Sequence, residues 1–322
     1  MQTRDLVAAL ADGRGWSGSE LARRFGVTRA AVWKRLDELR EAGLPLQAAA
    51  GRGYRLELPL ELLDATAIRA ALPPALQARF GDIAVHWDID STSSELLRTA
   101  VAHGDLAVCL AEQQSAGRGR RGRQWQSPPL CNVYLSVLKR FTRGMGSLAG
   151  LSLAVGVAAA RALERCGAPA LGLKWPNDVL AGDGKLAGIL VELGGEFLGP
   201  CHAVIGIGVN VYLPAVVRAA IDQPAADLAA ICAPLPSRNR VVAAVLGELA
   251  EVLDRFETDG FAGLRAAFVE RDRLFGQVLN LTDANGMQQG IGAGVDARGA
   301  LLLRQGDTIA GFDSAEVTVR RA

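Results

Sequence analysis

The chain has 322 residues, more than a single hydrophobic core usually holds, so we expect two or three domains. Half of the residues are hydrophobic and 21% are charged, a balance that excludes an intrinsically disordered chain. Because 35 basic residues nearly cancel 34 acidic ones, contact with an anionic partner requires a local basic patch.

Cysteines, histidines and apolar runs narrow the class of protein further. The five cysteines are widely spaced and form no CxxC pair, which favours reduced thiols in a cytoplasmic protein over disulfides or a zinc site. With only three histidines, we expect no metal site built from protein ligands alone. The N-terminus lacks the apolar segment of a secretory signal, and the longest largely apolar run, residues 148–160, is shorter than the ~20 residues of a membrane span. No membrane partner is expected.

Residues 1–63 are predicted to form a winged helix-turn-helix domain. Ser17 and Glu20 have the spacing of a capping box, Gly26 is placed to end that helix, and Thr28 can cap the next one. Two strands are expected between residues 46 and 56, with Arg52 at the hairpin tip. The third helix would present four side chains to the DNA major groove: Arg29, Ala30, Trp33 and Lys34.

Positive charge is concentrated in this N-terminal unit. Between Arg14 and Arg55 there are nine basic and four acidic residues, although the whole chain carries a net charge of only +1. Phosphate contacts require such a concentration, so we expect operator DNA as a partner, with Arg52 touching the backbone or minor groove. A three-helix protein-interaction module with a solvated basic face is the alternative.

Residues 64–272 alternate between strand and helix patterns, which predicts a mixed α/β domain. Strands are expected at residues 83–89, 107–113, 132–138, 172–175, 187–193 and 203–210, and helices at 94–103, 147–166, 239–257 and 261–272. Residues 273–322 lose the helical period, and short strands alternate there with turn signals. That pattern is typical of a small β-barrel, so the overall fold class is α+β.

The loop at residues 114–123 (QSAGRGRRGR) is the most informative stretch of the chain. It follows a predicted strand and carries four arginines and three glycines within seven residues. Glycines permit close backbone approach to a ligand, and arginines bind carboxylate or phosphate through two hydrogen bonds. By itself, the run is equally compatible with a nucleic-acid patch or a solvated loop.

Four further motifs place polar groups at the ends of strands. They are DSTS at residues 90–93, KWPND at 174–178, KLAGILVE at 185–192 and GIGVN at 206–210. Together they supply hydroxyls, ammonium groups, amides and small residues. Such strand ends suit a pocket for a small polar molecule that carries a phosphate ester.

In these motifs and their order, the chain resembles the bifunctional biotin–protein ligases that also repress transcription. The resemblance covers nearly all residues and implies a class II synthetase-like ligase domain followed by an SH3-like barrel. It also implies which residues bind biotin and biotinyl-adenylate: Ser91, Thr92, Ser93, Gln114, Gly117, Arg118, Gly119, Arg120, Trp125, Lys185, Gly188, Gly206, Gly208 and Asn210.

The resemblance further implies a reaction in two steps. The biotin carboxylate attacks the α-phosphate of ATP, and a lysine of the biotin carboxyl carrier protein, an acetyl-CoA carboxylase subunit, then attacks the adenylate. Lys185, Arg118 and Arg120 are the expected catalytic residues, since positioning and positive charge should carry most of this chemistry. ATP and Mg²⁺ are expected at Lys174, Asn177 and Asp178. The adenylate-bound form would act as a homodimeric repressor of biotin biosynthesis genes.

The sequence departs from the family pattern at two places. Ser93 stands where the family commonly has Asn, and residues 211–228 contain no tryptophan to cover the adenine, with Tyr212 their only aromatic residue. Two alternatives follow. A lipoyl ligase shares the central fold, although it gives no reason for a winged head. A transcription factor with a degenerate, ligand-sensing ligase domain would retain the head and lose the chemistry.

The distribution of basic residues adds one expectation. Of the 35, 31 are arginine, which nucleotide-composition bias in the genome explains. Nevertheless, the only two basic residues between Cys166 and Val217 are lysines, Lys174 and Lys185. A compact ammonium fits crowded phosphate chemistry where a guanidinium fork does not, so we expect Lys185→Arg to fail to restore activity.

Overall fold

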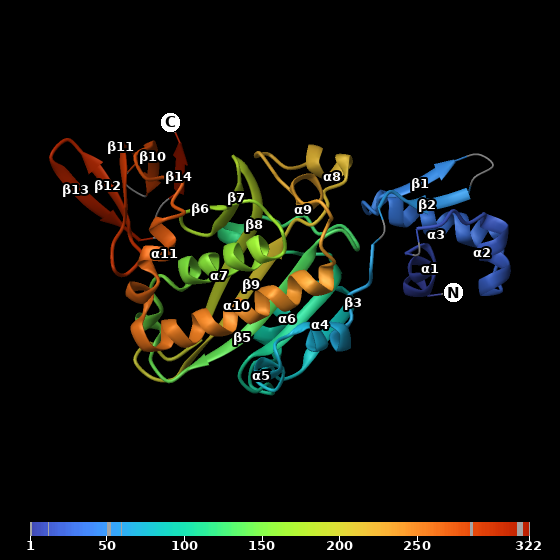
Figure 1. The fold of residues 1–322 in the computed structure, drawn as a ribbon, viewed down its shortest axis with the longest axis horizontal. Helices are drawn as coiled ribbons and strands as arrows, with labels where there is room; N and C mark the ends of the chain where they lie inside the picture. The colour runs from blue at the N-terminus through green and yellow to red at the C-terminus, as the bar shows by residue number, and fades with distance from the viewer. Residues whose placement is uncertain are drawn as a thin grey trace.

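A computed structural model describes residues 2–11, 13–49, 53–58, 60–283, 286–313 and 318–321. Within these residues the chain forms a two-stranded, a seven-stranded and a five-stranded sheet. The N-terminal head and the C-terminal sheet lie at opposite ends of the central part (Figure 1). The predicted α+β fold class is confirmed.

The head has three helices and a hairpin: α1 (Thr3–Leu10), α2 (Gly18–Phe25), α3 (Arg29–Glu41), β1 (Leu46–Ala49) and β2 (Gly53–Leu56). The predicted capping box is present, since Glu20 N donates to Ser17 Oγ at 3.1 Å and Ser17 N donates to the Glu20 carboxylate at 2.8 Å. Gly26 ends α2 in the left-handed conformation, with φ of 64°. Gly53, with φ of 76°, is required because a Cβ there would lie 2.1 Å from the carbonyl oxygen of Trp16.

The seven-stranded sheet has the order β3-β4-β5-β9-β8-β7-β6, and only the β3–β4 pair is parallel. All six strands expected in this region are present. Their bounds are β3 (Ile83–Ile89), β4 (Ala107–Gln114), β5 (Val133–Phe141), β6 (Gly172–Lys174), β8 (Gly184–Gly195) and β9 (Cys201–Val209). The expectation missed β7 (Asp178–Ala181), which forms a hairpin with β8.

Helices cover the two faces of this sheet unequally. The long helices α7 (Leu151–Arg165) and α10 (Arg238–Asp259) pack on one face, where they bury the main hydrophobic core (Figure 1). The other face carries α6 (Thr92–Thr99), which buries Leu96 against Cys109, Leu138 and Val204. Because α6 is short, part of that face stays uncovered. Shorter helices connect these layers: α4 (Ala65–Ala71), α5 (Pro74–Gln77), α8 (Ala215–Ala219) and α9 (Leu228–Ile231).

The C-terminal sheet is antiparallel and has the order β13-β12-β11-β10-β14. Its strands are β10 (Val278–Asp283), β11 (Gly286–Val295), β12 (Leu301–Gln305), β13 (Thr308–Phe312) and β14 (Thr318–Arg321). Buried leucines of this sheet, such as Leu279 and Leu301, belong to the same core cluster as α7 and α10. The indole Nε1 of Trp175 also donates to Gly299 O at 3.0 Å. The sheet is therefore packed into the central domain; its closure into an SH3-like barrel stays a prediction.

Several helix expectations need correction. The helix expected at residues 261–272 is a single 3-10 turn, Phe261–Gly263, followed by the short α11 (Arg265–Val269). The helix expected from residue 94 begins at Thr92, because the Ser91 side chain caps it, and ends at Thr99. The helix expected at 147–166 begins at Leu151, after a 3-10 turn and Gly150, whose φ is 80°.

Buried polar groups clamp the segment that joins the head to the central domain. Arg238, 2% exposed, donates to the carbonyl of Glu61 and pairs with buried Glu112 at 2.8 Å. The second Glu112 oxygen accepts from Leu63 N at 2.6 Å. Asn239 binds this segment through Leu62 O at 3.0 Å. Buried hydrogen bonds therefore hold residues 61–63 against the central domain.

Within the described part of the chain, no helix is both long and apolar enough to cross a membrane.

Candidate functional site

Three glycines hollow out the sheet face that α6 leaves uncovered. Gly188 on β8 pairs with Gly208 on β9, and Gly206 lies two residues earlier on the same face. The alternate residues, including Ile207, point to the opposite face and are buried in the core. A strand with alternating Gly and Ile therefore builds a floor without side chains on one face and a packed core on the other.

Trp125 occupies part of that hollow. A Cβ at position 208 would lie 2.5 Å from its indole ring, and a Cβ at 188 would lie 2.8 Å from it. The ring also lies 5.4 Å from the ammonium of Lys185. The buried Trp125 Nε1 has no hydrogen-bond partner within the described residues, which leaves it available to a ligand.

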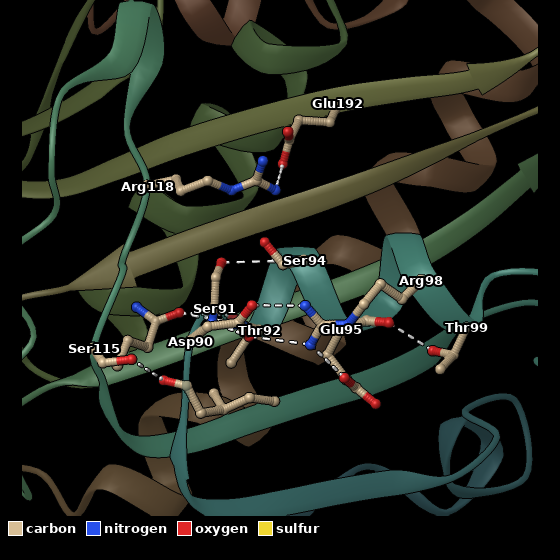
Figure 2. Close-up of polar contacts among 12 residues, drawn as sticks. Asp90, Ser91, Thr92, Ser94, Glu95, Arg98, Thr99, Ser115, Arg118 and Glu192 are labelled. Atoms are coloured by element: carbon tan, nitrogen blue, oxygen red, sulfur yellow. Dashed lines mark hydrogen bonds and ion pairs between the residues drawn. The ribbon is translucent and has the colours of Figure 1, made fainter.

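A cluster of hydroxyl groups forms one end of the hollow. Ser91 precedes α6, and its Oγ accepts from Ser94 N at 3.4 Å (Figure 2). Thr92 Oγ1 lies 2.8 Å from the Oγ of Ser136, and Ser93 Oγ lies 2.9 Å from the same atom. Ser136, on β5, is completely buried, and the sequence reasoning did not single it out.

Asp90 and Arg98 hold this end of α6 in place. Arg98 donates to both carboxylate oxygens of Asp90, at 2.6 and 3.1 Å, and to Glu95 at 2.7 Å (Figure 2). The hydrogen bonds from Arg98 lower the pKa of Asp90 to about 2. The turn that presents the hydroxyl groups is therefore fixed from outside the cavity.

The glycine–arginine loop forms one wall. Arg118 extends toward β8 and donates to the Glu192 carboxylate at 2.7 Å, so this guanidinium is held by an acidic partner (Figure 2). Arg120 is half-buried, and desolvation lowers the pKa of its guanidinium; the charge of Arg121 acts the same way and that of Asp178 opposes it. Arg121 has φ of 57°, a left-handed conformation that costs a non-glycine residue energy.

Lys185 lies at the centre of the site, beside Asp178 on the adjacent strand. Its Nζ is 2.6 Å from Asp178 Oδ1. Both side chains are largely buried, so the ammonium and the carboxylate neutralise each other inside the site. Lys174 lines the same cavity.

Two asparagines of the predicted site bind backbone groups. Asn177 Nδ2 donates to Ile189 O at 2.8 Å, which fixes the loop before β7 against β8. Asn210 Nδ2 donates to Lys185 O and Ala226 O, both at 3.1 Å. In this structure these amide nitrogens therefore hold the walls of the site in register.

These elements enclose a cavity of about 730 Å³, within the size range of small-molecule sites. Every residue predicted to bind biotin, adenylate or ATP lines it except Gly117. Gly117 lies behind the wall, where a Cβ would be 2.7 Å from both Ser127 Oγ and Trp125 O. Motifs that span 90–210 in the sequence thus meet at one site.

Sequence reasoning missed several lining residues. Tyr134 and Leu135 come from β5, and Leu213 with residues 220–225 comes from the segment after β9. Val319 of β14 also lines the cavity, so the C-terminal sheet reaches the site. Nothing local marked Tyr134, because β5 is buried almost throughout, and nothing marked Val319, because its approach depends on how the two sheets pack.

On the head, α3 exposes the side chains predicted to read DNA. Arg29, Ala30, Trp33 and Lys34 are all exposed, and Trp33 has 57% of its surface accessible. Val32, on the opposite side of the helix, is buried. Arg52, the predicted wing contact, lies outside the described residues.

The head also touches the segment that borders the cavity. Tyr212 Oη donates to Glu57 of the head at 2.5 Å. A Cβ on Gly43 would meet Pro128 at 3.0 Å and Val217 at 3.1 Å. Asn132 Oδ1 accepts from Val211 N at 2.9 Å, and the Asn132 carbonyl accepts from Arg238. The segment is therefore anchored next to the arginine that holds residues 61–64.

Comparisons with known proteins agree with the predictions for the central domain and for the head. Residues 89–210 match the biotin/lipoate A/B protein ligase family, and residues 2–55 match a helix-turn-helix domain. The biotin protein ligase of Aquifex aeolicus, solved in complex with biotin and ATP, aligns with a TM-score of 0.64 and 26% identity, covering 76% of this chain and 100% of that one. These matches define a protein ligase with a DNA-binding head.

Two curated relatives narrow the class. The bifunctional ligase/repressor BirA of Escherichia coli strain K12 is 37% identical over 317 residues, which are 98% of this chain and 97% of that protein. The biotin–[acetyl-CoA-carboxylase] ligase of Paracoccus denitrificans is 36% identical over 226 residues, covering 67% of this chain and 91% of that protein. The chain belongs to the family of bifunctional biotin–protein ligases and repressors.

Proposed function

We propose that the protein activates biotin with ATP to biotinyl-5′-adenylate and then transfers biotin to a lysine of a carboxylase carrier protein. In the first step the biotin carboxylate oxygen bonds to the α-phosphorus and pyrophosphate leaves. In the second step the lysine amine bonds to the carbonyl carbon, AMP leaves and the amine loses a proton. The single observation that carries the proposal is the convergence of the hydroxyl cluster, the glycine–arginine loop and Lys185 on one cavity.

Positive charge inside the cavity fits the first step, which brings two anions together. Lys185 is the group we assign to the carboxylate and phosphate oxygens, because it lines the cavity; its ammonium would exchange its present carboxylate partner, Asp178, for the substrate. Arg120, half-buried, would bind phosphate from the loop. Arg118 would first have to leave Glu192, so phosphate binding by this residue requires its guanidinium to exchange partners.

Mg²⁺ fits the same corner of the site. Asp178 is a largely buried carboxylate that lines the cavity, and Mg²⁺ is commonly held by one or two carboxylates together with substrate phosphates. Asp178 would hold the ion, which would supply positive charge to the phosphates of ATP. Asn177 Nδ2 is committed to Ile189 O, so its part would be to position the strand that carries Asp178.

The enzymatic proposal is tested with purified protein, ATP, Mg²⁺, a biotin carboxyl carrier domain and either biotin or lipoate. Mass spectrometry should show the carrier mass rise by one biotinyl group, with no product from lipoate. A lipoyl product would assign the chain to the sister activity. No product with either acid would leave a ligand-sensing transcription factor, a reading that the assembled cavity does not favour.

We further propose that the adenylate-bound protein dimerises and represses biotin biosynthesis genes. The contacts of Tyr212 with Glu57 and of Val217 with Gly43 link the cavity border to the DNA-binding head. Sedimentation should show a dimer only with biotin and ATP present, and only that species should bind a two-fold operator tightly. DNA binding that ignores both ligands would contradict this regulation.

We also propose that the chain divides into three domains, residues 1–63, 64–272 and 273–322, since each of the three sheets falls within one of them.

We propose the cytoplasm as the location of the protein. All five cysteines are buried free thiols, which supports a reducing compartment.

A further inference from the structure

The hydrogen bonds behind the hydroxyl cluster have a direction that can be assigned. Gln114 Oε1 accepts from Thr92 N at 3.0 Å, and a backbone amide only donates, so the orientation of the Gln114 carboxamide is fixed. The Thr92 hydroxyl lies 3.2 Å from the same oxygen and therefore donates to it. At the other end of the carboxamide, Gln114 Nε2 donates to Ser127 Oγ at 3.0 Å, which agrees with this orientation.

This direction propagates, because each hydroxyl group has only one proton. With its proton directed to Gln114, Thr92 accepts from Ser136, 2.8 Å away. Ser136 then has no proton for Ser93, so Ser93 donates to Ser136 across 2.9 Å. The reverse direction would leave the Thr92 and Gln114 oxygens facing each other as two acceptors, which is unfavourable in a buried cluster.

Ser93 Oγ is consequently left with acceptor capacity alone on the side that faces the cavity. Ser93 lines the cavity next to Gly206, where a Cβ would lie 2.7 Å from Ser93 Oγ. Glycine at position 206 is therefore what allows the Ser93 hydroxyl to lie this close to β9. Ser136, by contrast, is completely buried and acts only through its neighbours.

We propose that the directed chain from Ser93 through Ser136 and Thr92 to Gln114 makes Ser93 an obligatory acceptor for an N–H group of the ligand ring. Ser136 is then a positioning residue that determines specificity without touching the substrate. The inference rests on the proposed biotin substrate, whose ureido ring carries two N–H groups, whereas the dithiolane ring of lipoate carries none.

The test uses two carbamate analogues of biotin, each with one ureido N–H replaced by a ring oxygen. The replacement keeps the shape of the ring and turns a donor into an acceptor. Calorimetry of the full-length protein gives the ratio of Kd values, analogue over biotin. For the wild type we expect one of the two analogues to bind at least about tenfold more weakly than biotin, because two acceptors would meet at Ser93.

Ser136→Ala releases the Ser93 proton, which can then turn toward the cavity and meet the carbamate oxygen. The Kd ratio should fall at least about fivefold, because a repulsive contact between two acceptors is replaced by a hydrogen bond from Ser93 to the carbamate oxygen. Ser94→Ala, on the same helix and outside the directed chain, is the matched control and should keep the wild-type ratio. General loss of packing would weaken both ligands alike and leave the ratio unchanged.

If circular dichroism shows that Ser136→Ala is unfolded, Ser93→Ala decides, because deleting the acceptor should also collapse the ratio. A wild type that binds both analogues as well as biotin, or a ratio unchanged in the folded variants, overturns the inference. Pyrophosphate release with biotin is measured separately. Its absence would overturn the proposed ligase activity, while the binding ratio would still decide the role of Ser136.

Discussion

Lys185 and Asp178 face each other on adjacent strands of the β7–β8 hairpin, with Nζ 2.6 Å from Oδ1 and both side chains largely buried. The register shift in this hairpin places the lysine next to the carboxylate, and the ring of Trp125 bounds the ammonium on another side. A guanidinium group is larger than the ammonium that lies between this carboxylate and the ring.

From this geometry we expect Lys185→Arg to lose adenylate formation by about 100-fold, close to the loss in Lys185→Ala, because the guanidinium fork cannot place one point charge there. Single-turnover pyrophosphate release measures the effect. Lys139→Arg is the matched control: Lys139 pairs with Asp105 and Glu257 outside the cavity and should stay within about twofold of wild type. Full activity of Lys185→Arg would refute the argument.

Gly208→Ala should disturb biotin binding more than folding. The new methyl group would lie 2.5 Å from the Trp125 ring, so the ring must move into the cavity. We expect KM for biotin to rise by about tenfold or more, which corresponds to the ~1–3 kcal/mol of an overpacked site. Gly247→Ala on α10 is the control, because nothing lies within 4 Å of its Cβ position. Equal KM values in both variants would contradict the packing role of Gly208.

Arg238→Met should destabilise the protein strongly, since it leaves the Glu112 carboxylate buried without its cation. Removing one partner of a buried ion pair costs about 3–5 kcal/mol, whereas replacing both is close to neutral. In urea unfolding, the double variant Arg238→Met/Glu112→Leu should therefore have a larger free energy of unfolding than the single variant Arg238→Met. Recovery would remain partial, because Arg238 also donates to the carbonyls of Glu61 and Asn132. A double variant no more stable than Arg238→Met would show that the ion pair contributes little.

Arg29→Ala should weaken binding to DNA without affecting biotin transfer. Arg29 is exposed at the start of α3, and loss of one phosphate contact lowers the slope of log K against log salt by about 0.9. Fluorescence anisotropy with a random-sequence duplex measures the slope. Arg255→Ala, an exposed arginine on α10, removes the same charge from another domain and should leave the slope unchanged.

The thiols should be unreactive in the folded protein. Burial raises the pKa of Cys109 to about 12 and raises that of Cys131 further, so at pH 8 these groups stay protonated as well as inaccessible. Iodoacetamide at pH 8 should label none of the five cysteines in the native state within minutes and all five in guanidinium chloride. Rapid native labelling of Cys109 would show that α6 opens readily, because Cys109 packs beneath that helix.

Local patterns predicted much of the fold and the position of the site. The capping box at Ser17 and Glu20 and the left-handed Gly26 appear where the sequence indicated, since these features depend on neighbours within a few residues. The strands that carry Gly188 and Gly208 were also expected. The helix expected at 261–272 was wrong, because residues 271–273 extend along β6 instead, with Leu173 N donating to Arg271 O at 2.7 Å.

The features of the site that depend on long-range packing were not predicted. In the sequence Ser136 is an ordinary residue of a buried strand. Its importance arises only because α6 brings Thr92 and Ser93 against it. Val319 reaches the cavity from β14, more than 100 residues after the last sequence motif. Arg118 was expected to be a catalytic residue, and only the fold shows its present partner, Glu192.

The clamp on residues 61–64 bears on how the head could meet an operator. A flexible tether lets a DNA-binding domain search a volume, and its reach then grows with linker length. Here Arg238 and Asn239 bind the joint, residues 61–64, to the ligase domain, and Tyr212 forms a further hydrogen bond to Glu57 of the head. The joint therefore holds the head in a fixed orientation on the ligase domain. In any dimer, the separation of the two recognition helices would then be set by how the ligase domains meet. Half-site spacing on DNA would then report the geometry of the enzyme.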